Sequence, residues 1–415
     1  MIQNKKGFGL VVLCALVALS SGASGFQKKS AAGVEGMSFD AEDISSETKD
    51  EYGVVYSRDG KSLLKAPQDL IEYRVKDGTE VICDAAFSGS KIEKIVLPSS
   101  LKSIRAYAFS EILSLKSLAF ADFFSLENIV IPNSVKTIGE YAFKNCEHLK
   151  SVKLPQCLKR IEKHTFDCCY DLKSVYIPEN LDFIAEDCFD NCYNLERIEV
   201  APSNRKFCSV DGVLYSKDRK TLLVYPAENS GEKVVIAECV EKIAKGAFDS
   251  FYNPYNNEPS KTIVIPKNIK DVSEIDFSLF KDIEVADSNP AYCVVDGFLC
   301  SKDKKTLVAC SGGMAMKETL VIPEGIETIK NGALAGLYSL KTLELPSSIL
   351  RIEKDAFAEA ENDDDTSELQ IKSILIPKGT LAKFQKVIAP KYHPLIVEGD
   401  FSSFFSLLIF RKICI

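Results

Sequence analysis

The 415-residue sequence predicts a mainly β solenoid, built from repeats of about 23 residues with short parallel strands, little regular helix and inserted β-hairpins. The run LKSVKLPQCLKRIEKHTFDCC from Leu149 is followed at Leu172 by LKSVYIPENLDFIAEDCFDNC, and a more diverged copy, LENIVIPNSVKTIGEYAFKNC, begins at Leu126. Three landmarks keep the same spacing of 23 residues: Pro132, Pro155 and Pro178; Phe143, Phe166 and Phe189; Cys146, Cys169 and Cys192. Units this small cannot bury an apolar face alone, so they must stack on one another.

Each repeat is expected to open with a short strand. In the copy from Leu149, the alternation predicts that Leu149, Val152 and Leu154 point inward, while Ser151 and Lys153 point outward. The proline after this run ends the strand, because proline has no N–H to donate to a sheet. The second half of each repeat then supplies an isoleucine and a phenylalanine to the core: Ile138, Ile161 and Ile184 with Phe143, Phe166 and Phe189.

Decayed copies extend the solenoid over residues 79–398, and two hairpins are predicted to interrupt it near 201–232 and 286–316. The runs DGVLYSKDRKTLL from Asp211 and DGFLCSKDKKTLV from Asp296 identify these hairpins, since each places a charged turn between two apolar runs. A weaker form, GVVYSRDGKSLL from Gly53, predicts an N-terminal hairpin or cap over residues 51–78.

The repeat pattern in LPSSLKSIRAYAFS from Leu97 and IPNSVKTIGEYAFKNC from Ile131 resembles the BspA-like leucine-rich repeats of bacterial surface and secreted proteins. The resemblance covers most of the chain and implies a leucine-rich repeat solenoid. The hairpin runs resemble the inserts of such proteins, and the run from Ile376 resembles their closing unit. The functional implication is binding, because such proteins are described as adhesins that engage host proteins and their repeat motifs are not catalytic.

The first 25 residues are predicted to be a signal peptide, because Lys5 and Lys6 precede an apolar run over residues 8–19 and small residues come after it. A membrane anchor is the alternative, but the run is shorter than the roughly 20 residues that a span needs. We therefore expect an exported protein, secreted or at the cell surface, with no transmembrane span after signal removal. Residues 26–50 are rich in Ser, Glu, Lys and Gly and are predicted to be a flexible spacer.

The chain closes with an apolar tail over residues 399–415, which contains FSSFFSLLIFRKICI from Phe401. Its apolar stretch, residues 404–410, is too short to span a membrane, and Arg411 and Lys412 come directly after it. Packing against the last coil and contact with a membrane surface stay open, as does a role in sorting or anchoring. The favoured interpretation is that the tail has no functional role.

Charge and motif content argue against several classes of function. The net charge of −8 does not favour a polyanionic partner, so nucleic-acid binding is not expected. The sequence contains no HExxH, GxSxG or Walker motif and only three histidines, so we predict a non-enzymatic protein with no catalytic, cofactor-binding or metal site. A carboxylate pair brought together by folding is the catalytic arrangement that stays open. The acidic run 363–365 lacks the DxDxDG order of a calcium loop, so a solvated loop is preferred there.

Fourteen cysteines would suggest disulfides in a small secreted protein, but several of them occupy one repeat position. Neighbouring coils stack about 4.8 Å apart, so Cys146, Cys169 and Cys192 are expected to form a buried column. That separation permits a disulfide, whereas parallel Cβ vectors oppose one. A packed column of thiols is therefore the preferred interpretation.

Binding is expected on the outward strand positions, which form two columns along the solenoid. One column includes Val130, Lys153, Tyr176 and Glu199, and its neighbour includes Asn128, Ser151, Ser174 and Arg197. We predict that Lys153, Tyr176, Arg197 and Glu199 form a partner-contacting patch, since Tyr and Arg are favoured at interfaces. An ordinary strand surface, with residues selected for β propensity, is the alternative.

Two functional hypotheses remain. The first is an adhesin-like binding protein that recognises a host or extracellular protein or glycan through the strand face or the hairpins. The second is a structural spacer that acts by self-association through its end coils or its apolar tail. An array that only spaces other parts needs no selective ligand, so selective binding discriminates between them.

Overall fold

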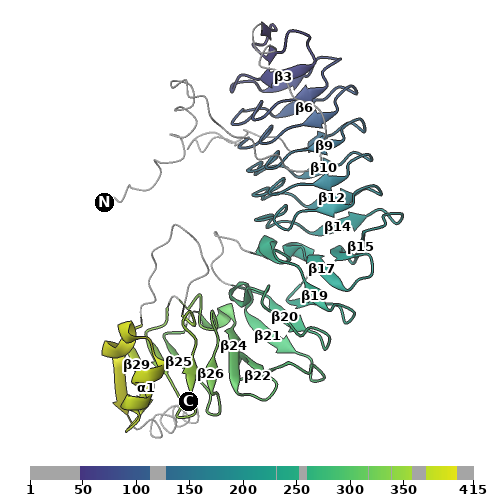
Figure 1. The fold of residues 1–415 in the computed structure, drawn as a ribbon. Helices are drawn as coiled ribbons and strands as arrows, with labels where there is room; N and C mark the ends of the chain where they lie inside the picture. Colours follow the sequence, from purple (N-terminus) through teal and green to yellow (C-terminus); the bar gives the residue numbers. More distant parts are fainter. Residues whose placement is uncertain are drawn as a thin grey trace, which may run out of the picture. The chain divides into compact units, whose positions relative to one another are not determined.

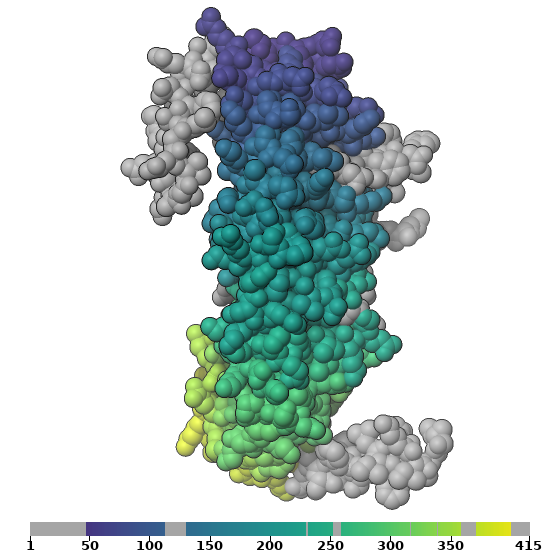
Figure 2. Space-filling model, turned by 90° about the vertical axis from the view of Figure 1, so that its right-hand side faces the viewer, coloured from purple at the N-terminus to yellow at the C-terminus, as the bar shows by residue number. Residues whose placement is uncertain are grey.

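A computed structural model describes residues 47–112, 128–229, 231–251, 259–315, 317–337, 339–357 and 371–399. The predicted signal peptide, most of the predicted spacer, residues 400–415 of the tail and the acidic run 363–365 lie outside the described residues. The described part belongs to one compact unit, residues 46–415. Its coils stack in sequence order, as the colours of Figures 1 and 2 show, so the predicted β solenoid is confirmed.

One wall of the solenoid consists of the strand that opens each repeat. Within each sheet of this wall, neighbouring strands pair in parallel with equivalent positions opposite each other: Val152 lies opposite Ile129 on one side and Val175 on the other. The predicted alternation is confirmed, because Val152 is buried while Ser151 and Lys153 are exposed. In chain order these strands are β4 (Glu72–Arg74), β6 (Lys94–Val96), β8 (Asn128–Val130), β10 (Ser151–Lys153), β12 (Ser174–Ile177), β14 (Arg197–Val200), β18 (Lys233–Val235), β20 (Thr262–Ile265), β21 (Asp282–Val285), β25 (Thr319–Val321), β27 (Thr342–Glu344), β29 (Ser373–Pro377) and β30 (Ile396–Gly399).

A second wall of very short parallel strands was not predicted. Of the repeat isoleucines, Ile138 and Ile161 are buried as expected and Ile184 is partly buried, and each position also pairs in parallel with its equivalent in a neighbouring coil, as Ile161 does with Ile184. A strand of two residues shows no alternation in the sequence, which is why only its burial was predictable. These strands are β5 (Val81–Ile82), β7 (Ser103–Ile104), β9 (Thr137–Ile138), β11 (Arg160–Ile161), β13 (Phe183–Ile184), β19 (Lys242–Ile243), β26 (Thr328–Ile329) and β28 (Arg351–Ile352).

The repeat phenylalanines form a stack between the walls. Successive rings lie 5.2–5.8 Å apart and within 11° of parallel: Phe87–Phe109, Phe109–Phe143, Phe143–Phe166 and Phe166–Phe189. Offset stacking at this distance adds to the burial of each ring. The Phe143 side chain is completely buried, so we assign it the largest contribution to its coil, roughly 3–5 kcal/mol against alanine.

The hairpins are confirmed, and they extend the second wall instead of folding over the first (Figure 1). Each insertion is a three-stranded antiparallel unit whose last strand pairs in parallel with the next two-residue strand: β3 with β5, β17 with β19 and β24 with β26. The units are β1 (Thr48–Lys49), β2 (Val55–Tyr56) and β3 (Ser62–Lys65); β15 (Phe207–Val210), β16 (Val213–Ser216) and β17 (Thr221–Val224); β22 (Tyr292–Val295), β23 (Phe298–Ser301) and β24 (Thr306–Cys310).

Each of the two later insertions contains a turn that was not predicted from the sequence. Besides the predicted charged turn over residues 217–220, Asp211 and Gly212 turn the chain between β15 and β16 with φ of 52° and 82°. Asp296 and Gly297 do the same between β22 and β23, with φ of 50° and 84°. Asp-Gly with both residues at positive φ is typical of a two-residue hairpin turn, so the dipeptide itself was the signal.

The middle strand of each of the two later insertions divides the core. On β16, Leu214 packs into the buried cluster of the preceding coils, while Val213 and Tyr215 pack into the next cluster. On β23, Leu299 belongs to the middle cluster, and its neighbour Phe298 belongs to the last one. Since successive side chains of a strand point to opposite faces, each of these two insertions separates two cores.

Short helical segments close the coils and the C-terminal end. Helix α1 (Leu381–Val387) buries Phe384 completely, and the 3-10 segment η6 (Pro390–Leu395) leads into β30. The remaining 3-10 segments are η2 (Ala227–Asn229), η3 (Asp249–Phe251), η4 (Phe277–Leu279) and η5 (Gly312–Met314). At η5 a Cβ on Gly312 would lie 2.0 Å from the Ser278 carbonyl oxygen, so only glycine fits between η4 and η5.

Candidate binding surface and carboxylate cluster

The four predicted patch residues lie on the outer face of β10, β12 and β14. Tyr176 on β12 lies opposite Glu199 on β14, and Arg197 precedes Glu199 by two residues, so both point outward. Lys153 comes directly after Val152, which pairs with Val175, and this register places Lys153 beside Tyr176. With strands about 4.8 Å apart, the four side chains occupy one small area of the wall.

The exposure and charges of the patch suit it to contact with another molecule. The Tyr176 side chain is 42% exposed, and Val130 beside Lys153 is 67% exposed. Arg197 Nε lies 3.1 Å from Glu199 Oε1, and an exposed pair of this kind contributes little stability. Lys153 has no ion-pair partner within the described part of the chain. The structure brings the four residues together, and their contact with a partner stays a prediction.

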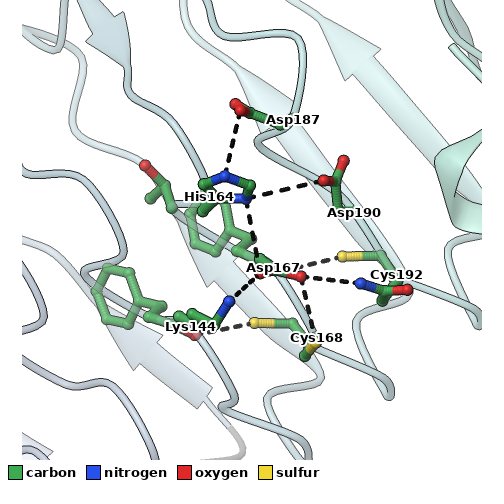
Figure 3. Close-up of polar contacts among 12 residues, drawn as sticks. Lys144, His164, Asp167, Cys168, Asp187, Asp190 and Cys192 are labelled. Carbon is green, nitrogen blue, oxygen red and sulfur yellow. Dashed lines mark hydrogen bonds and ion pairs between the residues drawn. The ribbon is translucent and has the colours of Figure 1, made fainter. Parts of the chain in front are cut away.

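A second cluster, on the turn that carries the repeat phenylalanine, was not predicted from the sequence. His164 lies among three carboxylates (Figure 3): its Nε2 is 3.3 Å from Asp187 Oδ2, and its Nδ1 is 3.6 Å from Asp167 Oδ2 and 3.8 Å from Asp190 Oδ2. The ring of Tyr141 stacks on His164 with centroids 4.7 Å apart. The cluster therefore joins side chains from three successive coils.

Asp167 is the buried and fully bonded member of this cluster. It accepts hydrogen bonds from Lys144 Nζ at 2.5 Å, from Asn191 Nδ2 at 3.0 Å and from Cys168 Sγ at 3.2 Å (Figure 3). Burial alone would raise the pKa of Asp167, but these hydrogen bonds outweigh it and hold the pKa below its ordinary value. Asp167 is therefore an ionised anchor between coils.

The pKa of Asp190 is shifted in the opposite direction, upward. Burial, followed by a hydrogen bond with the Asp249 carboxyl and the charge of that group, raises the pKa of Asp190 to about 9. Burial also raises the pKa of Asp249. The pair therefore holds a proton at neutral pH. Asp190 Oδ1, Asp187 Oδ1 and His164 Nδ1 are buried atoms without a hydrogen-bond partner.

This geometry differs from the carboxylate pair of a retaining glycosidase. Retaining glycosidases hold their two carboxyl groups roughly 5–5.5 Å apart with the sugar between them, whereas Asp190 and Asp249 interact directly with each other. Within the described ranges, no group of three or more His, Cys, Asp or Glu side chains is placed to hold a metal ion. The cluster instead links the coils on either side of the insertion β15–β17.

A regular signal for this cluster was present in the sequence. Two of its aspartates come directly after the repeat phenylalanine, and that position is occupied along the chain by Ser88, Ser110, Lys144, Asp167, Asp190 and Asp249. The insertion β15–β17 lies between Asp190 and Asp249 in sequence, yet their coils are adjacent in space. Alignment by phenylalanine position, with the insertion left out, would have brought the two carboxyl groups together.

The predicted column of thiols is confirmed. Cys146, Cys169 and Cys192 are buried free thiols in successive coils. Each Sγ donates to the carbonyl oxygen of the phenylalanine one coil earlier, over 3.0 Å to Phe109, 3.2 Å to Phe143 and 3.2 Å to Phe166. Burial raises the pKa of all three thiols, so the column remains uncharged.

No helix among the described residues is long and apolar enough to cross a membrane.

A solved structure of low sequence identity shares the fold, and a second one is reported beside it. The pneumococcal vaccine antigen PcpA is 16% identical, with a TM-score of 0.51, and the match covers 85% of this chain and 97% of that chain. A leucine rich cell surface protein of Faecalibacterium prausnitzii is 18% identical, with a TM-score of 0.47, over 84% of this chain and 98% of that chain. No curated protein matches the chain.

The family model for the BspA type leucine rich repeat region matches in six copies, over residues 65–124, 114–210 and 314–388. These ranges cover more than half of the sequence. The coils of β18, β20 and β21 lie outside the match, yet they continue the same solenoid between the two later insertions. The chain belongs to the BspA-type leucine-rich repeat family.

Proposed function

We propose that this chain is an exported, non-enzymatic binding protein, adhesin-like in action, which recognises an extracellular or host protein or glycan. The observation that carries the proposal is the exposed patch of Lys153, Tyr176, Arg197 and Glu199 on one continuous parallel sheet. A solenoid presents such a sheet as a long ordered surface, and repeat proteins use these surfaces for binding. The order of charged, apolar and small residues at the N-terminus supports export.

The fold allows the outward strand residues to vary without loss of stability. Inward strand residues such as Val152 and Val175 hold the coils together, while the outward positions beside them vary from Lys153 to Tyr176 to Glu199. Outward residues make no contribution to the phenylalanine stack, so the array tolerates substitution there. Either of the two later insertions provides a further exposed contact region along the second wall.

The test is saturable binding of residues 26–415 to a panel of extracellular-matrix proteins and glycans, compared with a Lys153→Glu/Arg197→Glu variant. Loss of both cations should weaken a ligand that uses the patch by roughly tenfold or more. Lys136→Glu/Lys159→Glu is the matched control, because both lysines are exposed beside the second wall. Equal binding by both variants would exclude the patch as the ligand-binding surface. The absence of any selective ligand would favour the spacer hypothesis.

A further inference from the structure

The strand face of β25, β27, β29 and β30 carries a column of outward side chains that is mostly aliphatic. Val321 on β25 lies opposite Glu344 on β27, which lies opposite Leu375 on β29, which lies opposite Val397 on β30. A single carboxylate is therefore enclosed between aliphatic side chains on both sides. Val397, at the edge of the sheet, is 49% exposed.

Glu344 differs from Glu199 and Glu284, two other strand-face glutamates, in having no cation. Glu199 on β14 pairs with Arg197 at 3.1 Å, and Glu284 on β21 pairs with Lys233 at 2.7 Å. Glu344 has no ion-pair partner among the described residues, although it is partly buried and burial raises its pKa. A partly desolvated carboxylate beside an aliphatic column favours a ligand that is both apolar and basic.

The chain itself carries a segment of that chemistry. Residues 404–410 are an uncharged apolar run, and the basic pair Arg411 and Lys412 comes directly after it. The segment begins directly after Gly399, which ends β30 opposite Pro377, so it starts at the edge of the column. Glu344 lies two strands from β30, about 10 Å away, while 11 extended residues reach up to about 36 Å.

We propose that residues 400–415 bind across the strand face of β25, β27, β29 and β30, with the apolar run on Val321, Leu375 and Val397 and the basic pair at Glu344. Attachment to β30 gives the segment a high effective concentration at this face, so modest contacts suffice. The covered face is then an internal interface, and the patch on β10, β12 and β14 remains open to an external partner. This inference is independent of the proposed function.

The test is site-specific photo-cross-linking in the full chain, with p-benzoylphenylalanine in place of Phe410. Cross-links are expected in peptides that contain residues 319–321, 342–344, 373–377 or 396–399. A mixture of isotopically labelled and unlabelled chains separates links within one molecule from links between two. Cross-links elsewhere on the chain, or mainly between two molecules, would overturn the proposal.

A charge exchange tests the role of Glu344. Glu344→Lys should lower the cross-link yield roughly tenfold, and the triple variant Glu344→Lys/Arg411→Glu/Lys412→Glu should restore it. The restoration shows that Glu344→Lys does not act by misfolding. Glu284→Lys on β21 is the matched control and should leave the cross-link yield unchanged. A cross-link yield that does not change in Glu344→Lys would contradict the proposal.

Discussion

At the scale of single residues, the Asp190–Asp249 pair should make stability depend on pH. Asp190 titrates near 3.8 in the unfolded chain, but the folded chain holds its proton up to about 9. The stabilisation from this proton is complete below the lower value and is lost as the pH rises toward the higher one. Asn at this position cannot ionise and can donate to Asp249. We therefore expect the stability of Asp190→Asn relative to the parent to rise by about 1–3 kcal/mol from about pH 5 to about pH 8.

Urea midpoints of both proteins across this pH range measure the effect. Asp282→Asn is a suitable control, because Asp282 is an exposed strand-face carboxylate on β21. Its difference from the parent should not change with pH. A flat difference for Asp190→Asn as well would mean that the carboxyl pair does not retain its proton in the folded chain.

At the scale of elements, the two later insertions are each fixed by one buried asparagine. Asn204 Nδ2 donates to the carbonyl oxygens of Pro178 and Leu181, and its Oδ1 accepts from the backbone of residues 206 and 207. Asn289 makes the same four hydrogen bonds before β22, to Pro266, Ile269 and residues 291 and 292. Each asparagine ties its insertion to the coil before it.

Asn204→Ala should therefore cost at least about 3 kcal/mol, since it leaves buried carbonyl and amide groups unpaired at about 1–3 kcal/mol each. The loss should appear as faster amide exchange in β15 and β16. Asn180→Ala is the control, because Asn180 is exposed and donates one hydrogen bond, to the Gln156 carbonyl oxygen. A cost for Asn204→Ala no larger than that of the control would contradict the assigned role.

The elements also show which features a sequence can predict. The strand over residues 151–153 and the buried Phe143, Phe166 and Phe189 were predictable, because stacking forces the same chemistry into the same position of every repeat. The two-residue strands depend on backbone pairing that leaves little trace in hydrophobic periodicity. The Asp211–Gly212 turn was signalled by its dipeptide, which an analysis of hydrophobic periodicity does not use. Hydrophobic periodicity does not reveal the cluster of His164 and Asp190, because varied residues occupy these positions in other repeats. Only alignment by the repeat phenylalanine, with the insertion left out, brings Asp190 and Asp249 together.

At the scale of the whole molecule, the insertions should determine how the chain unfolds. The buried residues in the described part of the chain form three clusters, and β16 and β23 lie at the two borders between them. A solenoid gains stability from contacts between neighbouring coils, so a border with different packing weakens the coupling across it. We expect native-state amide exchange in increasing urea to show three groups of amides, each with its own unfolding free energy, divided near β16 and β23.

Adjacent residues on β23 allow a sharp test of this division. Leu299 is completely buried in the middle cluster, and Phe298 is buried in the last cluster. Leu299→Ala should lower the exchange free energy of β18, β20 and β21 by about 2–5 kcal/mol, and Phe298→Ala should lower that of β25 and β27 by a similar amount. Because the two side chains are neighbours on one strand, a difference in which coils respond can arise only from the face to which each one points. If both substitutions lower protection equally in all coils, the three clusters unfold as one unit and the insertions do not divide the array.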